Sequence, residues 1–362
     1  MRSLLLLLAC AACSGQRITK ASSTVYVRSD TDRTTIVTPK VAVAGDVADG
    51  TSIEASYEID AWSGASVDVI TAATAAITEI RNEANAGVAH QHGDVRVSAG
   101  YRFSTEPDYD SHGFVLGARL DLANKNTTLG LDILGSTDRV GRAGDPFFDQ
   151  SLRSAGARAS LAQVLDNRSL VEVAWETTLL GGFQASPYRW VAIGGDGTCM
   201  SSAPFCLPES VPDERLRNAL YLRGRRSLGR SWSAGLEYRF YFDDWGVRSH
   251  AVQPDLAWRV SSRAVLSVRY RYYTQDEATF YRPRYFDLMS TGGHVTRDRK
   301  LSAFLGHEVG ASYLHRFEWC EGERVIVGGV RVGASYLDYL AFVGLDHVWA
   351  FETTAMLGLE LP

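Results

Sequence analysis

Charged side chains alternate with apolar ones along much of the chain, and these charged positions are the first candidates for a functional role. Glu237 and Arg239 are separated by one tyrosine, and so are Arg269 and Arg271. A guanidinium is charged at every physiological pH and donates hydrogen bonds in a fixed fork. Rows of arginine therefore suit either the lining of a polar cavity or pairing with carboxylates on a neighbouring strand.

The same alternation assigns sixteen charged side chains to one polar face. We expect this face to line the interior of a closed sheet. Mixed charges there would make a weakly selective pore, whereas ion pairs that fill and stiffen the interior would fit the pattern equally well. The predicted interior residues are Glu54, Glu58, Arg96, Arg102, Arg119, Asp121, Asp132, Glu172, Glu176, Arg223, Arg225, Glu237, Arg239, Arg269, Arg271 and Glu352.

Two other stretches combine carboxylates with a tryptophan at a predicted strand exit. We expect the tryptophans to anchor strand ends at a membrane interface, with a role in binding as the alternative. Aspartate oxygens suit divalent cations, but these few carboxylates define no coordination geometry, so no metal site is predicted. Small residues in the first stretch would let residues 66–77 fold inward as a constriction. The loop motif consists of Asp60, Trp62, Ser66, Asp68, Asp243, Asp244, Trp245 and His250.

Catalytic chemistry finds little support in the sequence. No Gly-x-Ser-x-Gly nucleophile motif occurs, and we expect neither enzymatic activity nor a cofactor. Cys199 and Cys206 flank a short stretch with Pro204, and in an oxidising compartment they would close a small disulfide, which leaves Cys320 unpaired. The net charge of -5 is spread thinly along the chain, which argues against a nucleic-acid partner.

The elements that position these residues are predicted to be long strands. Residues 231–242, 264–274 and 345–361 alternate strictly between an apolar and a polar face. Such strands exceed the ~5–6 residues usual in soluble sheets and match the ~9–11 residues that a tilted strand needs to cross a bilayer. Aromatic residues gather towards their ends, as in the girdles of outer-membrane barrels.

Short and long connections also alternate. Two-residue turns such as Asp49-Gly50 and Gly93-Asp94 come between longer connections, which we place at 104–112, 181–214 and 275–300 among others. Short periplasmic turns and long outer loops are typical of outer-membrane barrels. A periplasmic β-sandwich or β-helix would explain the alternation but not the strand length or this rhythm of connections.

The predicted fold is therefore all-β. Residues 22–362 form a single transmembrane antiparallel β-barrel of about sixteen strands, with fourteen as the alternative. Residues 1–16 are predicted to be an export signal, with Arg2 before an apolar run that is too short to span a membrane as a helix. Cys13 would be the lipidated cysteine if the small residues before it act as a lipobox, and ordinary cleavage is the other outcome.

Six segments that follow one another along the chain carry a family resemblance. The longest, residues 238–250, reads YRFYFDDWGVRSH, and the others are residues 57–68, 163–168, 187–189, 271–275 and 298–302. Together they resemble a bacterial outer-membrane family catalogued as domain of unknown function 3570. The resemblance implies an outer-membrane barrel. It also implies an envelope redox or export context, in which a periplasmic lipoprotein or a thioredoxin-like protein would be the partner.

We therefore predict a bacterial outer-membrane barrel that forms a pore or export channel for a small solute or an envelope product. A non-conducting barrel that scaffolds or binds an envelope redox or lipoprotein partner is the first alternative, and a barrel-borne hydrolase is the second. Outer-membrane lipid is the expected surrounding of the barrel. The sequence identifies neither the substrate nor the oligomeric state.

Overall fold

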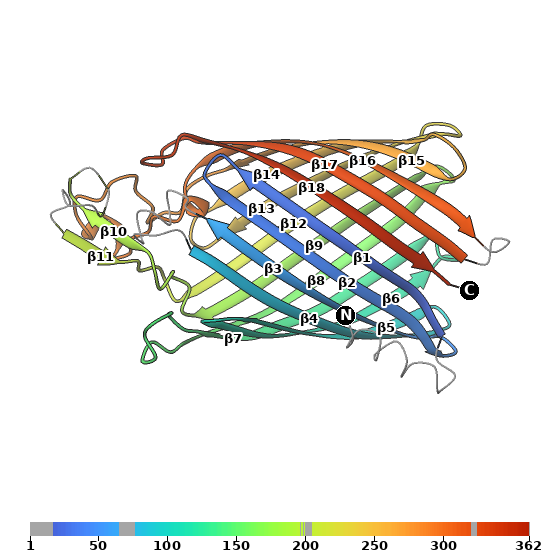
Figure 1. Cartoon of the computed structure of the whole chain (residues 1–362), viewed down its shortest axis with the longest axis horizontal. Helices are drawn as coiled ribbons and strands as arrows, with labels where there is room; N and C mark the ends of the chain where they lie inside the picture. The colour runs from blue at the N-terminus through green and yellow to red at the C-terminus, as the bar shows by residue number, and fades with distance from the viewer. Residues whose placement is uncertain are drawn as a thin grey trace.

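Sixteen antiparallel strands close into one barrel in the computed structural model (Figure 1), which confirms the predicted fold class and the higher strand count. The structure describes residues 17–64, 77–195, 197, 199, 205–319 and 324–361. The predicted export signal with Cys13, the loop-motif residues Ser66 and Asp68, and Cys320 lie outside the described residues.

The barrel strands have 12 to 17 residues each, long enough to cross a bilayer at a tilt. In chain order they are β1 (Arg17–Asp30), β2 (Thr34–Ala48), β3 (Thr51–Gly64), β4 (Ile77–His92), β5 (Val95–Glu106), β6 (Tyr109–Leu122), β7 (Thr127–Val140), β8 (Gln150–Asp166), β9 (Ser169–Gly182), β12 (Glu214–Ser227), β13 (Trp232–Asp243), β14 (Arg248–Arg259), β15 (Ala264–Gln275), β16 (Phe304–Trp319), β17 (Arg324–Tyr339) and β18 (His347–Glu360).

Strand pairing leaves no open edge in the barrel sheet. Each strand pairs with its neighbours in sequence, β9 pairs with β12, and β1 pairs with both β2 and β18. Closure of this kind satisfies every row of backbone hydrogen bonds, which a sheet in hydrocarbon requires.

The period-two alternation in the sequence separates the two faces of the sheet. On β7, Leu129, Leu131 and Ile133 are 42%, 49% and 50% exposed, while Gly130 and Asp132 between them point to the other face. Exposed apolar side chains of this kind recur on the other strands. An outward band of such residues suits contact with lipid chains.

The two ends of the barrel differ in their connections. At one end, which we call the short-turn end, the described turns have two to four residues, and both Arg17 and Leu361 lie there. The turn at Asp49-Gly50 needs glycine because Gly50 has a φ of 69° and a Cβ would come 2.4 Å from the carbonyl oxygen of Gln91.

The opposite end, which we call the long-loop end, carries residues 141–149, 183–213, 276–303 and 340–346 between strands. The predicted long connection at 104–112 is wrong. β5 and β6 continue through it to a turn of only Pro107 and Asp108, and the hydroxyl of Thr105 donates to Asp110 at 2.6 Å across the hairpin. Polar residues in this stretch hid the continuing strands.

The long loops contain their own short elements. A two-stranded sheet of β10 (Trp190–Ile193) and β11 (Phe205–Pro208) lies beyond the barrel at the left of Figure 1. Two 3-10 turns, η2 (Met289–Thr291) and η3 (Arg299–Leu301), lie in the loop between β15 and β16. Within the described residues, no helix is both long and apolar enough to span a membrane.

Candidate functional site

The polar face of the sheet is its concave face. Arg225 on β12 reaches Asp255 on β14 at 2.7 Å, although β13 lies between them. Arg269 on β15 reaches Glu352 at 3.3 Å, although β16 and β17 lie between β15 and β18. Side chains from non-adjacent strands converge only on the inside of a closed sheet, so these residues lie in the lumen.

The ladder registers place all sixteen predicted interior residues on this concave face, where most of them meet an opposite charge within 4.0 Å. The ion pairs join Glu58 to Lys40, Arg102 to Glu83, Arg119 to Asp132, Glu172 to Arg158 and Arg223, Arg223 to Glu237, Arg225 to Asp255, Arg269 to Glu308 and Glu352, and Arg271 to Glu308.

Five of the predicted residues are not part of this ion-pair network. Asp121 accepts a hydrogen bond from the hydroxyl of Thr128 at 2.7 Å. The other four, Glu54, Arg96, Glu176 and Arg239, have no oppositely charged partner within the part of the chain that the structure describes. The interior therefore contains both a cross-linked charge network and single charges that remain available to a solute.

Several interior residues were missed by the sequence prediction. Glu83, Asp255 and Glu308 all accept ion pairs on the concave face. Glu308 lies between the inward glycines Gly306 and Gly310, and glycine carries no polarity that would mark the inner face of a strand. The inner face of such a strand can be assigned from the residues that lie opposite it on the neighbouring strands. That assignment requires the strand register, which the sequence alone does not provide.

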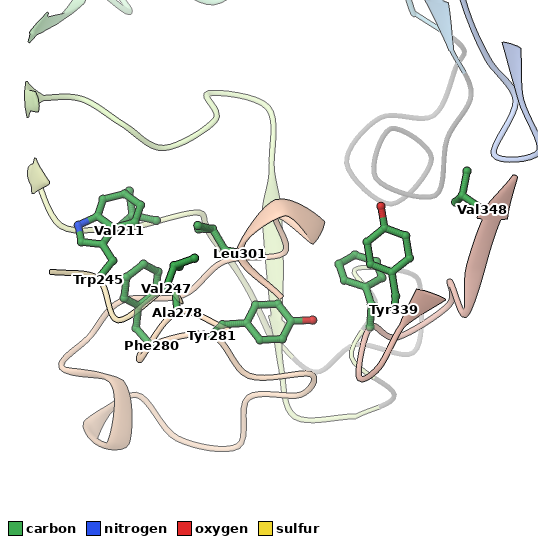
Figure 2. Close-up of a cluster of buried hydrophobic side chains, with 10 residues drawn as sticks. Val211, Trp245, Val247, Ala278, Phe280, Tyr281, Leu301, Tyr339 and Val348 are labelled. Atoms are coloured by element: carbon green, nitrogen blue, oxygen red, sulfur yellow. The ribbon is translucent and has the colours of Figure 1, made fainter. Parts of the chain in front are cut away.

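Three long loops fold together at the long-loop end. We call the described residues of 183–213, 276–303 and 340–346 the cap. Their shared apolar core includes Val211, Phe280, Leu301 and Phe342. It takes in Trp245 from the β13–β14 turn, which Figure 2 shows beside Val211, Phe280 and Leu301. Burial of these large side chains holds loops that are far apart in sequence in one unit.

Trp245 belongs to this core and does not anchor a strand at a membrane interface. Its side chain is 4% exposed, and its indole N–H donates to the carbonyl oxygen of Glu214 at 2.8 Å. The guanidinium of Arg215 lies 4.2 Å from the ring centroid on one side, and the ring of Phe280 meets it edge-on at 5.3 Å. The predicted interface role of Trp245 is therefore wrong.

The aspartates of the loop motif are occupied by protein groups. The buried carboxylate of Asp243 accepts from Nε of Arg215 at 2.9 Å, from the hydroxyl of Tyr241 at 2.6 Å and from the backbone N–H of Val247 at 2.9 Å. Asp244 accepts from the backbone N–H of Leu216 at 3.0 Å. These contacts hold the β13–β14 turn against β12.

The remaining described members of the loop motif are dispersed. Asp60 accepts hydrogen bonds from Thr38 and Arg81 within the barrel wall, two residues before the half-buried Trp62. Nδ1 of His250 lies 2.8 Å from the hydroxyl of Tyr238 on the outer face, so it is not part of the cap. In the described residues no three His, Cys, Asp or Glu side chains are grouped so that they could hold a metal ion.

A polar network holds the cap together from inside. Glu209 accepts from Arg189 at 2.9 Å, from the backbone N–H of Ser186 at 2.6 Å and from the hydroxyl of Thr296, which comes from another loop, at 2.5 Å. A disulfide joins Cys199 to Cys206, with 6.0 Å between the Cα atoms, and ties the β10–β11 hairpin.

Two contacts attach the cap to distant points on the rim of the barrel. Tyr188 donates its hydroxyl to Asp108 in the β5–β6 turn and accepts from the backbone N–H of Ala143 at 2.6 Å. Burial raises the pKa of the Asp108 carboxyl above its usual range. At a different part of the rim, Arg299 pairs with Asp32 in the β1–β2 turn at 2.6 Å. The cap thus extends from its own strands to the β5–β6 turn and to the β1–β2 turn.

Several cavities lie along the interior of the described part of the barrel. One of about 480 Å³ is roofed by cap residues such as Val211 and Leu301 and has a wall that includes Arg217 and Tyr241. Another, of about 980 Å³, follows the strands from β1 to β8 and is lined largely by glycine, alanine and serine, including Gly87 and Gly100. Small inward side chains leave space on that side of the barrel, although charged side chains such as Glu54 and Arg102 also line it.

Solved structures with the same overall shape are outer-membrane barrels. The chain is similar to a structure described as bacterial polysaccharide outer membrane secretin, with a TM-score of 0.52 and 11% identity over 94% of this chain and 98% of that chain. It is also similar to CdiB from Acinetobacter baumannii, with a TM-score of 0.51 and 8% identity over 94% of this chain and 60% of that one. At these identities the likeness shows the fold alone.

The sequence itself is matched at the level of a family. No curated protein matches the chain. Residues 72–151 and 147–328 match the family described as Protein of unknown function (DUF3570), which covers more than half of the chain and agrees with the resemblance of the segments at residues 163–168 and 238–250. The chain therefore belongs to this family of outer-membrane-type β-barrels.

Proposed function

We propose that the protein is an outer-membrane channel for a small polar solute, with the short turns in the periplasm and the cap at the cell surface. The observation that carries this proposal is the closed sixteen-strand sheet with a charged concave face. Barrels of eight strands are just filled by their side chains, whereas barrels of about sixteen leave an aqueous space unless a segment plugs them.

The position of the other segments supports passage. The cap and the β10–β11 hairpin lie at the end of the barrel in Figure 1, and the glycine-rich side of the wall leaves a cavity of about 980 Å³. The exposed apolar side chains on the outer face support a membrane location. The predicted export signal is also consistent with an outer-membrane location.

Single-channel recording in a planar bilayer tests this function. We expect the purified, folded protein to give a stable conductance. Arg269→Glu with Arg271→Glu places two carboxylates beside Glu308 and should shift the ion preference towards cations. The control is Arg263→Glu, because Arg263 lies in the short turn after β14 and pairs with Glu318. Equal selectivity in all three proteins would contradict a lumen lined by these arginines.

A second function is favoured by the attachment of the cap. Contacts at Asp108 and Asp32 hold the cap to two parts of the rim, and such a cap suits a barrel that does not conduct but presents a surface to an envelope partner. Folded protein that never conducts, even after the cap contacts are removed, would favour this scaffold over the channel.

A further inference from the structure

The cavity beneath the cap contains arginine charge that the protein does not neutralise. Its wall is formed by inward side chains of β8, β9 and the four strands from β12 to β15, and its roof by Val211, Trp245 and Leu301. Arg217 and Arg239 both face this space. Neither has a carboxylate partner within the described part of the chain, in contrast to Arg223 on the same face of β12, which pairs with Glu237 at 2.7 Å.

Arg217 is the most constrained of these groups. Its Nε atom is buried and has no hydrogen-bond partner. The residue opposite Arg217 in the β12–β13 ladder is Asp243, but that carboxylate already accepts from Arg215, Tyr241 and the backbone of Val247. A buried guanidinium donor without an acceptor is costly, so the site favours a bound group that supplies one.

Arg239 is held in place by aromatic rings. Its guanidinium lies 5.3 Å from the ring centroid of Tyr221 and 5.2 Å from that of Tyr241, and its Nε donates to the Tyr221 hydroxyl at 3.0 Å. In the β12–β13 register, Arg217 lies opposite Asp243 and Arg239 lies opposite Tyr221. The pair between them is the small Ala219 opposite Tyr241, and both arginines line the same cavity. The two arginines therefore border one recess instead of filling it.

The carboxylates around the cavity do not cancel this charge. Glu209 and Asp298 both pair with Arg189, at 2.9 and 3.6 Å. Glu176 is the one lining carboxylate without an oppositely charged partner in the described residues. Thr178 and Ser249 add hydroxyl groups to the wall. The lining thus offers forked cationic donors, one free acceptor and neutral hydroxyls.

We propose that this cavity binds a small hydroxylated oxyanion, a carboxylate or phosphate of about the size of a single sugar. Arg217 and Arg239 receive the oxyanion through charge-assisted hydrogen bonds, and Glu176 and the hydroxyls receive the hydroxyl groups. The volume of about 480 Å³ lies within the range of small-ligand sites. The inference that such oxyanions are transported rests on the proposed channel function, whereas the inference that the cavity binds them does not.

Isothermal titration of the full-length folded protein in detergent tests the site. The probes are glucuronate, glucose 6-phosphate and the neutral control glucose. We expect saturable binding of one or both oxyanions, which also distinguishes carboxylate from phosphate, and at least tenfold weaker binding of glucose. Arg217→Gln should weaken oxyanion binding by about 10- to 100-fold, whereas Arg223→Gln should change it less than twofold because that arginine is already paired.

Three results would overturn the site: no saturable binding of either oxyanion, glucose binding as tightly as the oxyanions, or equal losses in Arg217→Gln and Arg223→Gln. Gel mobility before and after heating shows that each variant is folded, and Arg239→Gln replaces Arg217→Gln if the latter does not fold. Conductance separates this proposal from the channel function. If the protein conducts but binds no oxyanion, only the proposed binding site is refuted. If it binds an oxyanion but does not conduct, only the proposed channel function is refuted.

Discussion

At the scale of single residues, Asp243 holds the β13–β14 turn, and with it Trp245, against β12. It is the last residue of β13, and its carboxylate receives the Arg215 guanidinium beneath the ring of Trp245. Arg215 and Asp243 are both buried, with 10% and 0% of their side chains exposed. Removal of one partner from such a pair leaves the other charge without compensation, which is far more costly than the pair itself is stabilising.

We expect Asp243→Ala to lower the free energy of unfolding of the cap by about 3–5 kcal/mol. The measurement is urea unfolding followed by tryptophan fluorescence, since Trp245 lies in the same cluster. The matched control is Asp149→Ala, which removes the exposed partner of Arg139 and should cost less than about 1 kcal/mol. Similar losses of unfolding free energy in both variants would show that burial does not determine how much the Arg215–Asp243 pair contributes to stability.

At the scale of elements, the cap behaves as one unit because its loops share a core, and two polar contacts join it to distant parts of the rim. Tyr188 reaches Asp108, and Arg299 reaches Asp32. Each contact joins a loop to a short turn between adjacent strands. Loss of these contacts would free the outer parts of the cap and leave the apolar cluster intact.

Tyr188→Phe combined with Arg299→Gln should therefore increase the open time of the channel and the rate of protease cleavage in the cap. Each change removes a hydrogen-bonding group that the cap uses at the rim. Recording in planar bilayers and limited proteolysis measure the two effects. Arg316→Gln serves as the control, because Arg316 pairs with Glu360 at the short-turn end. Unchanged gating with increased proteolysis would mean that the cap does not restrict the pore.

The strands were predictable and the cap was not, for a physical reason. Alternation with period two is a local property, so segments such as residues 264–274 reveal their faces without knowledge of any partner. The cap core joins Val211, Trp245 and Phe342, which are separated by long stretches of chain and show no common pattern. Arg217 could not be identified for the same reason, since the register places it opposite Asp243 and only the side-chain contacts show that this carboxylate is bound by Arg215.

At the scale of the whole molecule, the two ends of the barrel should face different compartments. Gly144 lies in the loop between β7 and β8, has a φ of 79° and would have open space around an added Cβ. An epitope tag inserted beside it should be detected on intact cells. A tag at Gly93-Asp94, in a tight turn at the opposite end, should be detected only after the outer membrane is permeabilised. The reverse pattern would invert the proposed topology.

The pairing of β1 with β18 also has a consequence for biogenesis. Eleven residue pairs, from Lys20 with Glu360 to Asp30 with Ala350, join the first strand to the last. A growing chain cannot form this seam until β18 has been synthesised, so the barrel cannot close before that point. Until then two strands have unpaired backbone groups, and an exported chain in that state depends on being kept from pairing with other chains.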